Sequence, residues 1–297
     1  MFNFFSKKHL SALLALLSLT GASSLTAQDY YYPQMQDDCC YSYQDCCLAS
    51  CNRFYIGGFG GALYSDSTRM VQLGTAFFTE AAGGPMAIDA SGNSGRNSAG
   101  FGGVQIGYEW KEKPFSLGCM GCSDWNISPA AEFEAYWYKH SKHGDLINPT
   151  TRLPEHDFVD TFPMNVGVYL LNGVFALNSC HLGQFSPYVG GGVGVANIFI
   201  RHADSLQVSP PEVGVNHFNS DRSDSSWAFA AQAKAGLRYN ICDRVHLFGE
   251  YRFLYVDTSR YIFGGTITPT HAPTSPWNVE IKNICYNGFA FGLQFDL

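Results

Sequence analysis

The chain has 297 residues and a formal net charge of −7, with 14% charged residues, 15% aromatic residues and 31 glycines. The low content of charged residues, against about 25% in ordinary domains, excludes a disordered polar chain, and the negative charge argues against nucleic acid as a partner. Abundant glycine together with aromatic residues favours a protein built from many strands.

The N-terminus predicts an exported protein. Lys7 and Lys8 precede an apolar run over residues 10–19, and small residues follow as far as Ala27. This three-part pattern is typical of a cleaved secretory signal peptide, which we assign to residues 1–27. An uncleaved membrane anchor is the alternative, but the run is shorter than the roughly 20 residues of a membrane-spanning helix.

The segment after the signal differs in composition from the rest of the chain. Residues 28–51 are rich in Tyr, Asp and Cys and show no strand or helix periodicity. We interpret them as a cysteine-rich N-terminal segment held by cross-links. Residues 52–297 then form a second, much longer domain.

Glycine-containing stretches with period-2 alternation recur through this domain and predict eight strands. They lie near residues 53–65, 100–110, 130–139, 164–176, 186–200, 227–241, 245–257 and 284–297. In the last stretch Phe289, Phe291 and Leu293 share one face, while Gln294 and Asp296 share the other. The first and fourth stretches are apolar on both faces, which leaves their sides unassigned.

The connections between these strands alternate in length. Those after strands one, three, five and seven are long, and those after strands two, four and six are shorter. A transmembrane β-barrel sorts its loops in this way, with short periplasmic turns, long external loops and strands that alternate apolar-out and polar-in. We therefore predict an all-β, antiparallel up-and-down barrel of eight strands with four long external loops. A ten-stranded alternative, with extra hairpin arms at residues 68–78 or 258–267, stays open.

Several stretches resemble a known family. "RFYIGGFGGALYS", "SPYVGGGVGVANIF", "AFAAQAKAGLRYNICDRVHLFGEYRFLYVD" and the closing "FAFGLQFDL" are similar to the small outer-membrane barrels of Gram-negative bacteria, the OmpA-like or opacity group often labelled "porin family". The resemblance covers residues 52–297 and implies the fold, an outer-membrane location and a surface-antigen or adhesin role. Such barrels usually end on Phe, whereas this chain ends on Leu297.

The ten cysteines are the most informative residues for function. On the predicted topology nine of them fall on the periplasmic side, and only Cys285 lies at the outer start of the last strand. The nine are Cys39, Cys40, Cys46, Cys47, Cys51, Cys119, Cys122, Cys180 and Cys242. Because exported proteins meet oxidising conditions, we expect disulfides, either within the chain or between chains in an envelope network. The clustering is similar to the cysteine-rich outer-membrane proteins of chlamydia-like and legionella-like bacteria.

Charged side chains on the polar faces of the strands are predicted to point into the lumen. They are Glu132, Glu134, Lys234, Arg238, Glu250 and Arg252. The interior of an eight-stranded barrel is just wide enough for side chains to fill. We expect these charges to form a locked network that plugs the lumen, and an ion path through them is the alternative.

The sequence predicts no catalytic site, no cofactor and no metal. Loop histidines stand beside Ser and Asp at His202 and His217, but no nucleophile motif is present and the histidine spacing matches no ligand motif. A zinc site at Cys119 and Cys122 would lack a second cysteine pair. The expected function is structural, stabilising the envelope and presenting external loops, and a small-solute channel is the alternative. Expected partners are outer-membrane lipid, other envelope proteins through disulfides, and a host surface ligand.

Overall fold

The computed structural model describes residues 52–111, 115–116, 125–149, 152, 157–269 and 271–297. The predicted signal peptide and the cysteine-rich segment 28–51 therefore lie outside the described residues. Within these ranges the chain forms strands and two short 3₁₀ helices. Their bounds are β1 Arg53–Ser65, β2 Arg69–Ala76, η1 Glu80–Ala82, β3 Met86–Ser94, β4 Asn97–Glu109, β5 Phe115–Ser116, β6 Trp125–Ile147, β7 Asp157–Ser179, η3 Cys180–Leu182, β8 Phe185–Ile200, β9 Asp204–Ser209, β10 Asp224–Cys242, β11 Val245–Val256, β12 Ser259–Phe263, β13 Trp277–Ile281 and β14 Ile284–Asp296.

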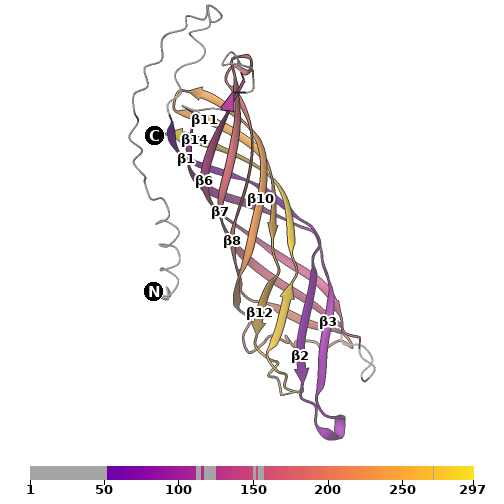
Figure 1. Ribbon diagram of the computed structural model, residues 1–297. Helices are drawn as coiled ribbons and strands as arrows, with labels where there is room; N and C mark the ends of the chain where they lie inside the picture. The colour runs from indigo at the N-terminus through magenta and orange to yellow at the C-terminus, as the bar shows by residue number, and fades with distance from the viewer. Residues whose placement is uncertain (1–51, 112–114, 117–124, 150–151, 153–156, 270) are drawn as a thin grey trace, which may run out of the picture. The chain divides into compact units, whose positions relative to one another are not determined.

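Eight long strands close into a ring. In order around the ring they are β1, β4, β6, β7, β8, β10, β11 and β14, and each is antiparallel to both of its neighbours. The first and last strands pair along their whole length, with Gly60 opposite Phe291. This closure leaves the ring without a free strand edge. The predicted antiparallel barrel of eight strands is confirmed (Figure 1).

Glycine lets neighbouring strands of the ring approach closely. A Cβ atom added at Gly61 would lie 1.9 Å from the carbonyl oxygen of Phe289, and one at Gly194 would lie 1.9 Å from that of Tyr169. Both positions face the interior, where a strongly curved wall brings backbones together. The glycine-rich composition of β1 and β8 therefore reflects the small size of the barrel.

The alternation of buried and exposed residues follows the predicted faces. On β14, Phe289, Phe291 and Leu293 are exposed, whereas Gln294 is buried. On β10, Gln232, Lys234 and Arg238 are buried, as are Glu250 and Arg252 on β11. The polar faces of these strands line the lumen, and the apolar faces form the outer wall. All six charged residues that the sequence predicts for the lumen are buried in this arrangement.

The long connections continue the sheet beyond the ring. β2 and β3 form a hairpin whose β3 pairs with the outer end of β6, and β13 pairs with β2 and β12. On the other side, β9 pairs with the outer end of β7. We call these five strands, with their connections and the outer ends of β6 and β7, the external extension. Residues 69–76 and 259–263 are thus strands, but they stand in the extension, so the ten-stranded alternative is wrong.

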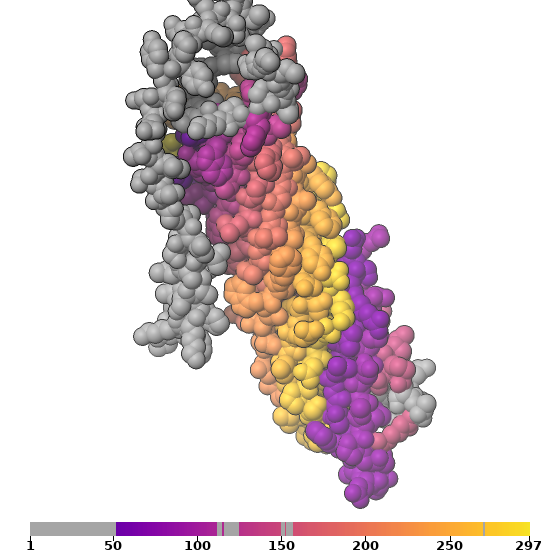
Figure 2. Space-filling model, viewed as in Figure 1, coloured from indigo at the N-terminus to yellow at the C-terminus, as the bar shows by residue number. Residues whose placement is uncertain are grey.

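The external extension has a hydrophobic core of its own. The Phe218 ring stacks on Phe263 at 4.8 Å, Phe263 packs on Phe162 at 5.7 Å, and Trp277 contacts Phe158 at 6.1 Å. All five side chains are buried. In Figure 2 the yellow residues near the C-terminus lie beside the purple residues of β2 and β3 at the end far from the short turns, which agrees with the β2–β13 pairing. Among the residues that the structure describes, no helix is long and apolar enough to cross a membrane.

Candidate functional site

Five of the six predicted lumen charges meet in one cluster inside the barrel. Lys234 Nζ lies 2.5 Å from Glu132 Oε1 and 2.7 Å from Glu134 Oε1. Arg252 bonds Glu134 through both terminal nitrogens, at 3.0 and 3.2 Å, and donates its Nε–H to Glu250 at 2.5 Å. Each of these five side chains is at most 3% exposed. Three carboxylates therefore face two cations away from solvent.

Neutral side chains from β1, β7, β8 and β10 complete this central cluster. The Tyr55 hydroxyl donates to Glu132 at 2.9 Å, and the Tyr188 hydroxyl donates to Glu250 at 2.7 Å. Gln232 donates to Glu134 at 2.5 Å and to Asn172 at 2.9 Å. Because buried charges are tolerated only when their hydrogen-bonding capacity is met, these partners hold the cluster in a single arrangement.

A second cluster lies toward the end of the barrel that carries the short turns. Arg238 contacts Glu109 at 3.0 Å, and Arg53 contacts the same carboxylate at 2.8 Å. Arg53 also pairs with Asp296, whose carboxylate lies 2.9 Å from His246 Nε2. Arg238 is thus placed in this lower cluster, apart from the other five predicted lumen charges. Glu109, Arg53 and Asp296 extend the network that the six predicted residues form.

Aromatic side chains close the lumen above the central cluster. The Arg252 guanidinium lies 4.1 Å from the centre of the Phe59 ring, and Phe59 in turn packs edge-on against Phe101, Tyr136 and Phe248 at 6.1 to 6.5 Å. Between the two charged clusters the described residues leave a cavity of about 10 Å³, lined by Glu132, Lys234 and Arg238 among others. A volume of this size holds about one water molecule. Between this aromatic layer and the lower cluster, described side chains occupy the lumen.

The outer wall carries two rows of aromatic residues with an apolar band between them. Near the external extension Trp137, Tyr169 and Trp227 lie side by side, with ring centres 6.3 Å apart in each neighbouring pair. Near the short turns the corresponding ring pairs are Phe54–Tyr108, Tyr108–Trp110 and Phe185–Tyr239. The exposed residues between the rows are apolar, and they include Ile56, Val104, Ile106, Phe133, Leu171, Val193, Leu237 and Phe291.

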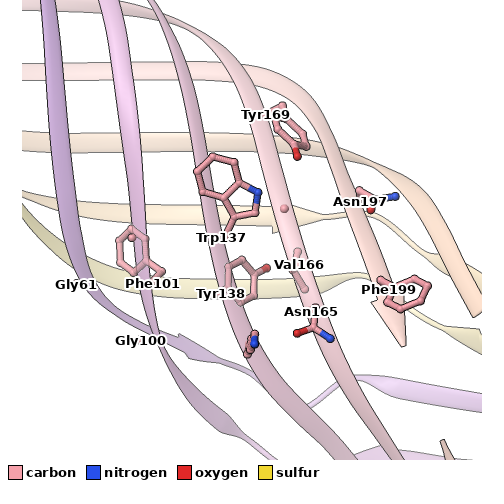
Figure 3. Close-up of a pocket in the computed structure, with 13 residues that line it drawn as sticks. Gly61, Gly100, Phe101, Trp137, Tyr138, Asn165, Val166, Tyr169, Asn197 and Phe199 are labelled. Carbon is pink, nitrogen blue, oxygen red and sulfur yellow. The ribbon is translucent and has the colours of Figure 1, made fainter. Parts of the chain in front are cut away.

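A shallow hollow of about 600 Å³ opens on this wall at the level of the first row. Trp137, Tyr169 and Phe199 line it together with the glycines Gly100 and Gly102 (Figure 3). The missing side chains of the glycines leave the space, and the large rings on neighbouring strands frame it. The hollow and the lumen cavity are lined by entirely different residues.

The structure places three of the ten cysteines. Cys180 lies in η3 and Cys242 ends β10, both at the end with the short turns. Cys285 lies near the start of β14, at the opposite end, opposite Tyr255. The predicted sides of these three residues agree with the strand directions. Cys39, Cys40, Cys46, Cys47, Cys51, Cys119 and Cys122 lie outside the described residues, so their pairing stays a prediction.

Two histidines and a glutamate meet on the external extension. Glu212 and His217 belong to the connection between β9 and β10, and His271 belongs to the connection between β12 and β13. The Glu212 Oε2 atom lies 3.8 Å from His217 Nε2 and 3.5 Å from His271 Nε2. Sequence reasoning missed this cluster, because its members come from two connections and share no motif spacing. The only available signal was the presence of a histidine in each connection.

Comparison with known proteins gives distant similarities only. No family model matches the chain, and no curated protein matches it. Among solved structures, neisserial surface protein A is similar at 12% identity and a TM-score of 0.36, over 82% of this chain and 96% of that one. The outer membrane protein OprG from Pseudomonas aeruginosa is similar at 12% identity and a TM-score of 0.32, over 82% and 98%. The attachment invasion locus protein of Yersinia pestis is similar at 11% identity and a TM-score of 0.23, over 79% and 98%. Such values are too low to support a function, and the barrel is established by the strand pairing itself.

Proposed function

We propose that this protein is a structural barrel of the outer membrane of a Gram-negative bacterium, with a sealed lumen and an external extension presented to the surroundings. The observation that carries the proposal is the filled lumen, in which five charged side chains of the central cluster are at most 3% exposed. In this view the barrel anchors the chain, and activity resides outside the membrane.

The outer wall supports a membrane location. Membrane barrels display an outward apolar band about 25 Å tall between two girdles of aromatic residues. Here the rows at Trp137–Tyr169–Trp227 and at Phe54–Tyr108–Trp110 flank a band of exposed aliphatic and aromatic residues. In water such a band would be a large apolar patch, whereas lipid covers it at no cost. The predicted signal peptide over residues 1–27 supports export to that membrane.

The central cluster supports a structural role over a channel. A conducting pore needs a continuous path of water or of exposed polar groups. In the lumen the carboxylates of Glu132 and Glu134 are instead occupied by Lys234 and Arg252, and the cavity beside them has room for about one water molecule. Moving an ion through would require these pairs to separate in a low-dielectric interior, which is costly.

The external extension supports an antigen-like or adhesin-like role. Exposed apolar side chains stand on its surface, among them Phe77, Ile262 and Ile267 at 47 to 72% exposure. Exposed aromatic and aliphatic residues on a rigid scaffold are suited to anchoring a partner. A host surface ligand is therefore the proposed partner, and its identity is a matter for binding experiments with the extension intact.

Planar-bilayer recordings test the sealed lumen. The purified full chain, shown to be folded by heat-dependent gel migration, is expected to give no steady openings. A single-channel conductance that persists in independent preparations and is absent from bilayers treated with detergent alone would refute the proposal. In that case the alternative, a channel for small solutes, would be adopted.

We also propose that disulfides on the periplasmic side hold the chain or link it to other envelope proteins, and this has its own test. Cys242 is exposed and Cys180 is half-buried at the end with the short turns, the side on which Cys119 and Cys122 are expected. Envelope preparations run on gels with and without reductant should show higher-mass species only without it, and a monomer band in both lanes would exclude links between chains. On intact cells an impermeant thiol reagent should reach Cys285 and leave Cys242 unlabelled.

A further inference from the structure

We infer that Glu212, His217 and His271 form a binding site for a divalent transition-metal ion of the zinc class on the external extension. The site lies apart from the lumen and from the aromatic rows of the outer wall. It goes beyond the structural role proposed above, since a sealed barrel does not require it. Three ligand atoms of suitable type converge on one point: two imidazole nitrogens and one carboxylate oxygen.

The distances fit a metal centre. His271 Nε2 and His217 Nε2 lie 3.5 and 3.8 Å from Glu212 Oε2, and all three atoms lie within 4.8 Å of one another. Zinc bonds of about 2.1 Å in a tetrahedral arrangement place ligand atoms about 3.4 Å apart. Bringing all three pairs of atoms to that spacing requires closures of at most about 1.4 Å, because no pair is more than 4.8 Å apart, and rotations of side chains in two connections can supply them.

The hydrogen bonds of the two imidazoles set the tautomer that a metal requires. His217 Nδ1 lies 3.1 Å from the carbonyl oxygen of Ser205, and His271 Nδ1 lies 2.5 Å from that of Ala272. A carbonyl oxygen only accepts, so both Nδ1 atoms donate, and a neutral ring then carries its lone pair on Nε2. Both Nε2 atoms face the Glu212 carboxylate. A histidine held through Nδ1 by a backbone carbonyl is the usual second shell of a metal ligand.

The simplest competing explanation is an ion pair between Glu212 and a protonated histidine. An ion pair needs one imidazolium, yet here two imidazoles point at the same oxygen, in side chains 2% and 9% exposed. Two buried imidazolium ions at this spacing would repel each other. A single divalent cation satisfies both nitrogens and the carboxylate together. Glu212 is 32% exposed, which leaves that side open for a water molecule as fourth ligand.

The ligand set selects the class of metal. Two imidazoles with one carboxylate suit zinc, copper or nickel, whereas calcium and magnesium prefer a shell made entirely of oxygen. The site joins the β9–β10 connection to the β12–β13 connection. The His217 ring also packs on Phe158 at 5.1 Å, so the metal would tie the external extension together at the edge of its aromatic core.

Metal titration of the full chain in detergent tests the inference. The protein is first freed of metal with a chelator, and its cysteines are alkylated so that thiolates do not bind. Zn²⁺ followed by calorimetry, and Co²⁺ followed by its visible absorption, are expected to show one ion per chain with a tetrahedral Co²⁺ spectrum.

Matched variants decide whether the three residues are the ligands. Glu212→Gln and His271→Gln should each weaken binding by at least about 10-fold, since even the loss of a second-shell partner costs that much. Glu80→Gln and His143→Gln change the same residue types at exposed positions of the extension and should bind as the parent chain does. All variants are compared after heat-dependent gel migration shows them folded. Equal affinity in Glu212→Gln, His271→Gln and parent, or no saturable binding by the parent, would overturn the inference and leave the bilayer result unaffected.

Discussion

Replacing Lys234 by Met probes the central cluster of the lumen most directly. Lys234 is the sole cation within 2.7 Å of both Glu132 and Glu134 among the described residues, and it is 2% exposed. Met has nearly the same length and no charge, so the substitution removes the charge while it keeps the volume. Three buried carboxylates would then face Arg252 alone.

The expected cost follows from the charge imbalance. Breaking a buried ion pair by removing one partner costs about 3–5 kcal/mol, because the remaining charge stays desolvated. A difference of this size lowers the ratio of folded to unfolded protein by roughly 10² to 10³·⁵. Glu132→Gln should behave differently: it leaves Glu134 and Glu250 facing two cations, and its amide still accepts from Lys234. Glu132→Gln should lower the free energy of unfolding by about 1 kcal/mol, the value of one hydrogen bond.

Urea unfolding in lipid vesicles measures both values. Refolding and unfolding curves of the parent, Lys234→Met and Glu132→Gln are followed by tryptophan fluorescence until the two directions coincide. Lys139→Met, which removes an exposed lysine from the outer end of β6, is the control and should not shift the curve. The order of stability should be parent and Lys139→Met, then Glu132→Gln, then Lys234→Met.

Two results would refute this reasoning. If Lys234→Met were as stable as Glu132→Gln, the lumen would be hydrated well enough to support an unpaired carboxylate, and the cluster would not be a sealed plug. If Glu132→Gln were the more damaging change, the cluster would need its third negative charge. The account of three carboxylates shared by two cations would then be wrong.

The remaining predictions concern the wall and the external extension. Phe291→Lys, at the middle of the apolar band, should cost about 2–4 kcal/mol of folding free energy in vesicles, and Phe295→Lys, nearer the band's edge, about 0–1 kcal/mol; equal costs would contradict the membrane placement. Gly194→Ala should destabilise the barrel by about 1–3 kcal/mol because its Cβ would lie 1.9 Å from a backbone oxygen, whereas Gly173→Ala, with nothing within 4 Å, should be tolerated in the same urea assay. Burial raises the pKa of Asp160 to about 8, so the folded chain keeps a proton that the unfolded chain releases between about pH 4 and pH 8. The free energy of unfolding should therefore fall as the pH rises through this window, and Asp160→Asn should reduce that fall. If urea unfolding gave the same difference in free energy between pH 5 and pH 8 for the parent and for Asp160→Asn, the assignment would be contradicted.

The strands of the ring follow from local pattern alone. A barrel wall has one face in lipid and one in the lumen, so apolar and polar residues alternate along each strand. This period of two residues can be recognised in the sequence. The predicted stretch 53–65 coincides with β1, and 245–257 with β11 to within one residue. Where both faces of a strand are apolar, the pattern does not predict which face points inward. On β1 the inward residues are Tyr55, Phe59 and Leu63. The outward residues include Phe54 and Ile56. Large aromatic residues line the lumen there because they pack against Arg252 and its neighbours.

The partners of each side chain were decided by tertiary structure. Alternation predicted that Glu134 and Lys234 face the lumen, but their contact depends on the register and stagger of strands far apart in the chain. The strands of the external extension are shorter and have no face toward lipid. Because their alternation is therefore weaker, the sequence analysis predicts loops for most of these residues. Glu212, His217 and His271 come together only because the β9–β10 and β12–β13 connections pack on the same aromatic core. A period of two determines which side of a wall a residue occupies, and only the closed three-dimensional arrangement determines what it meets there.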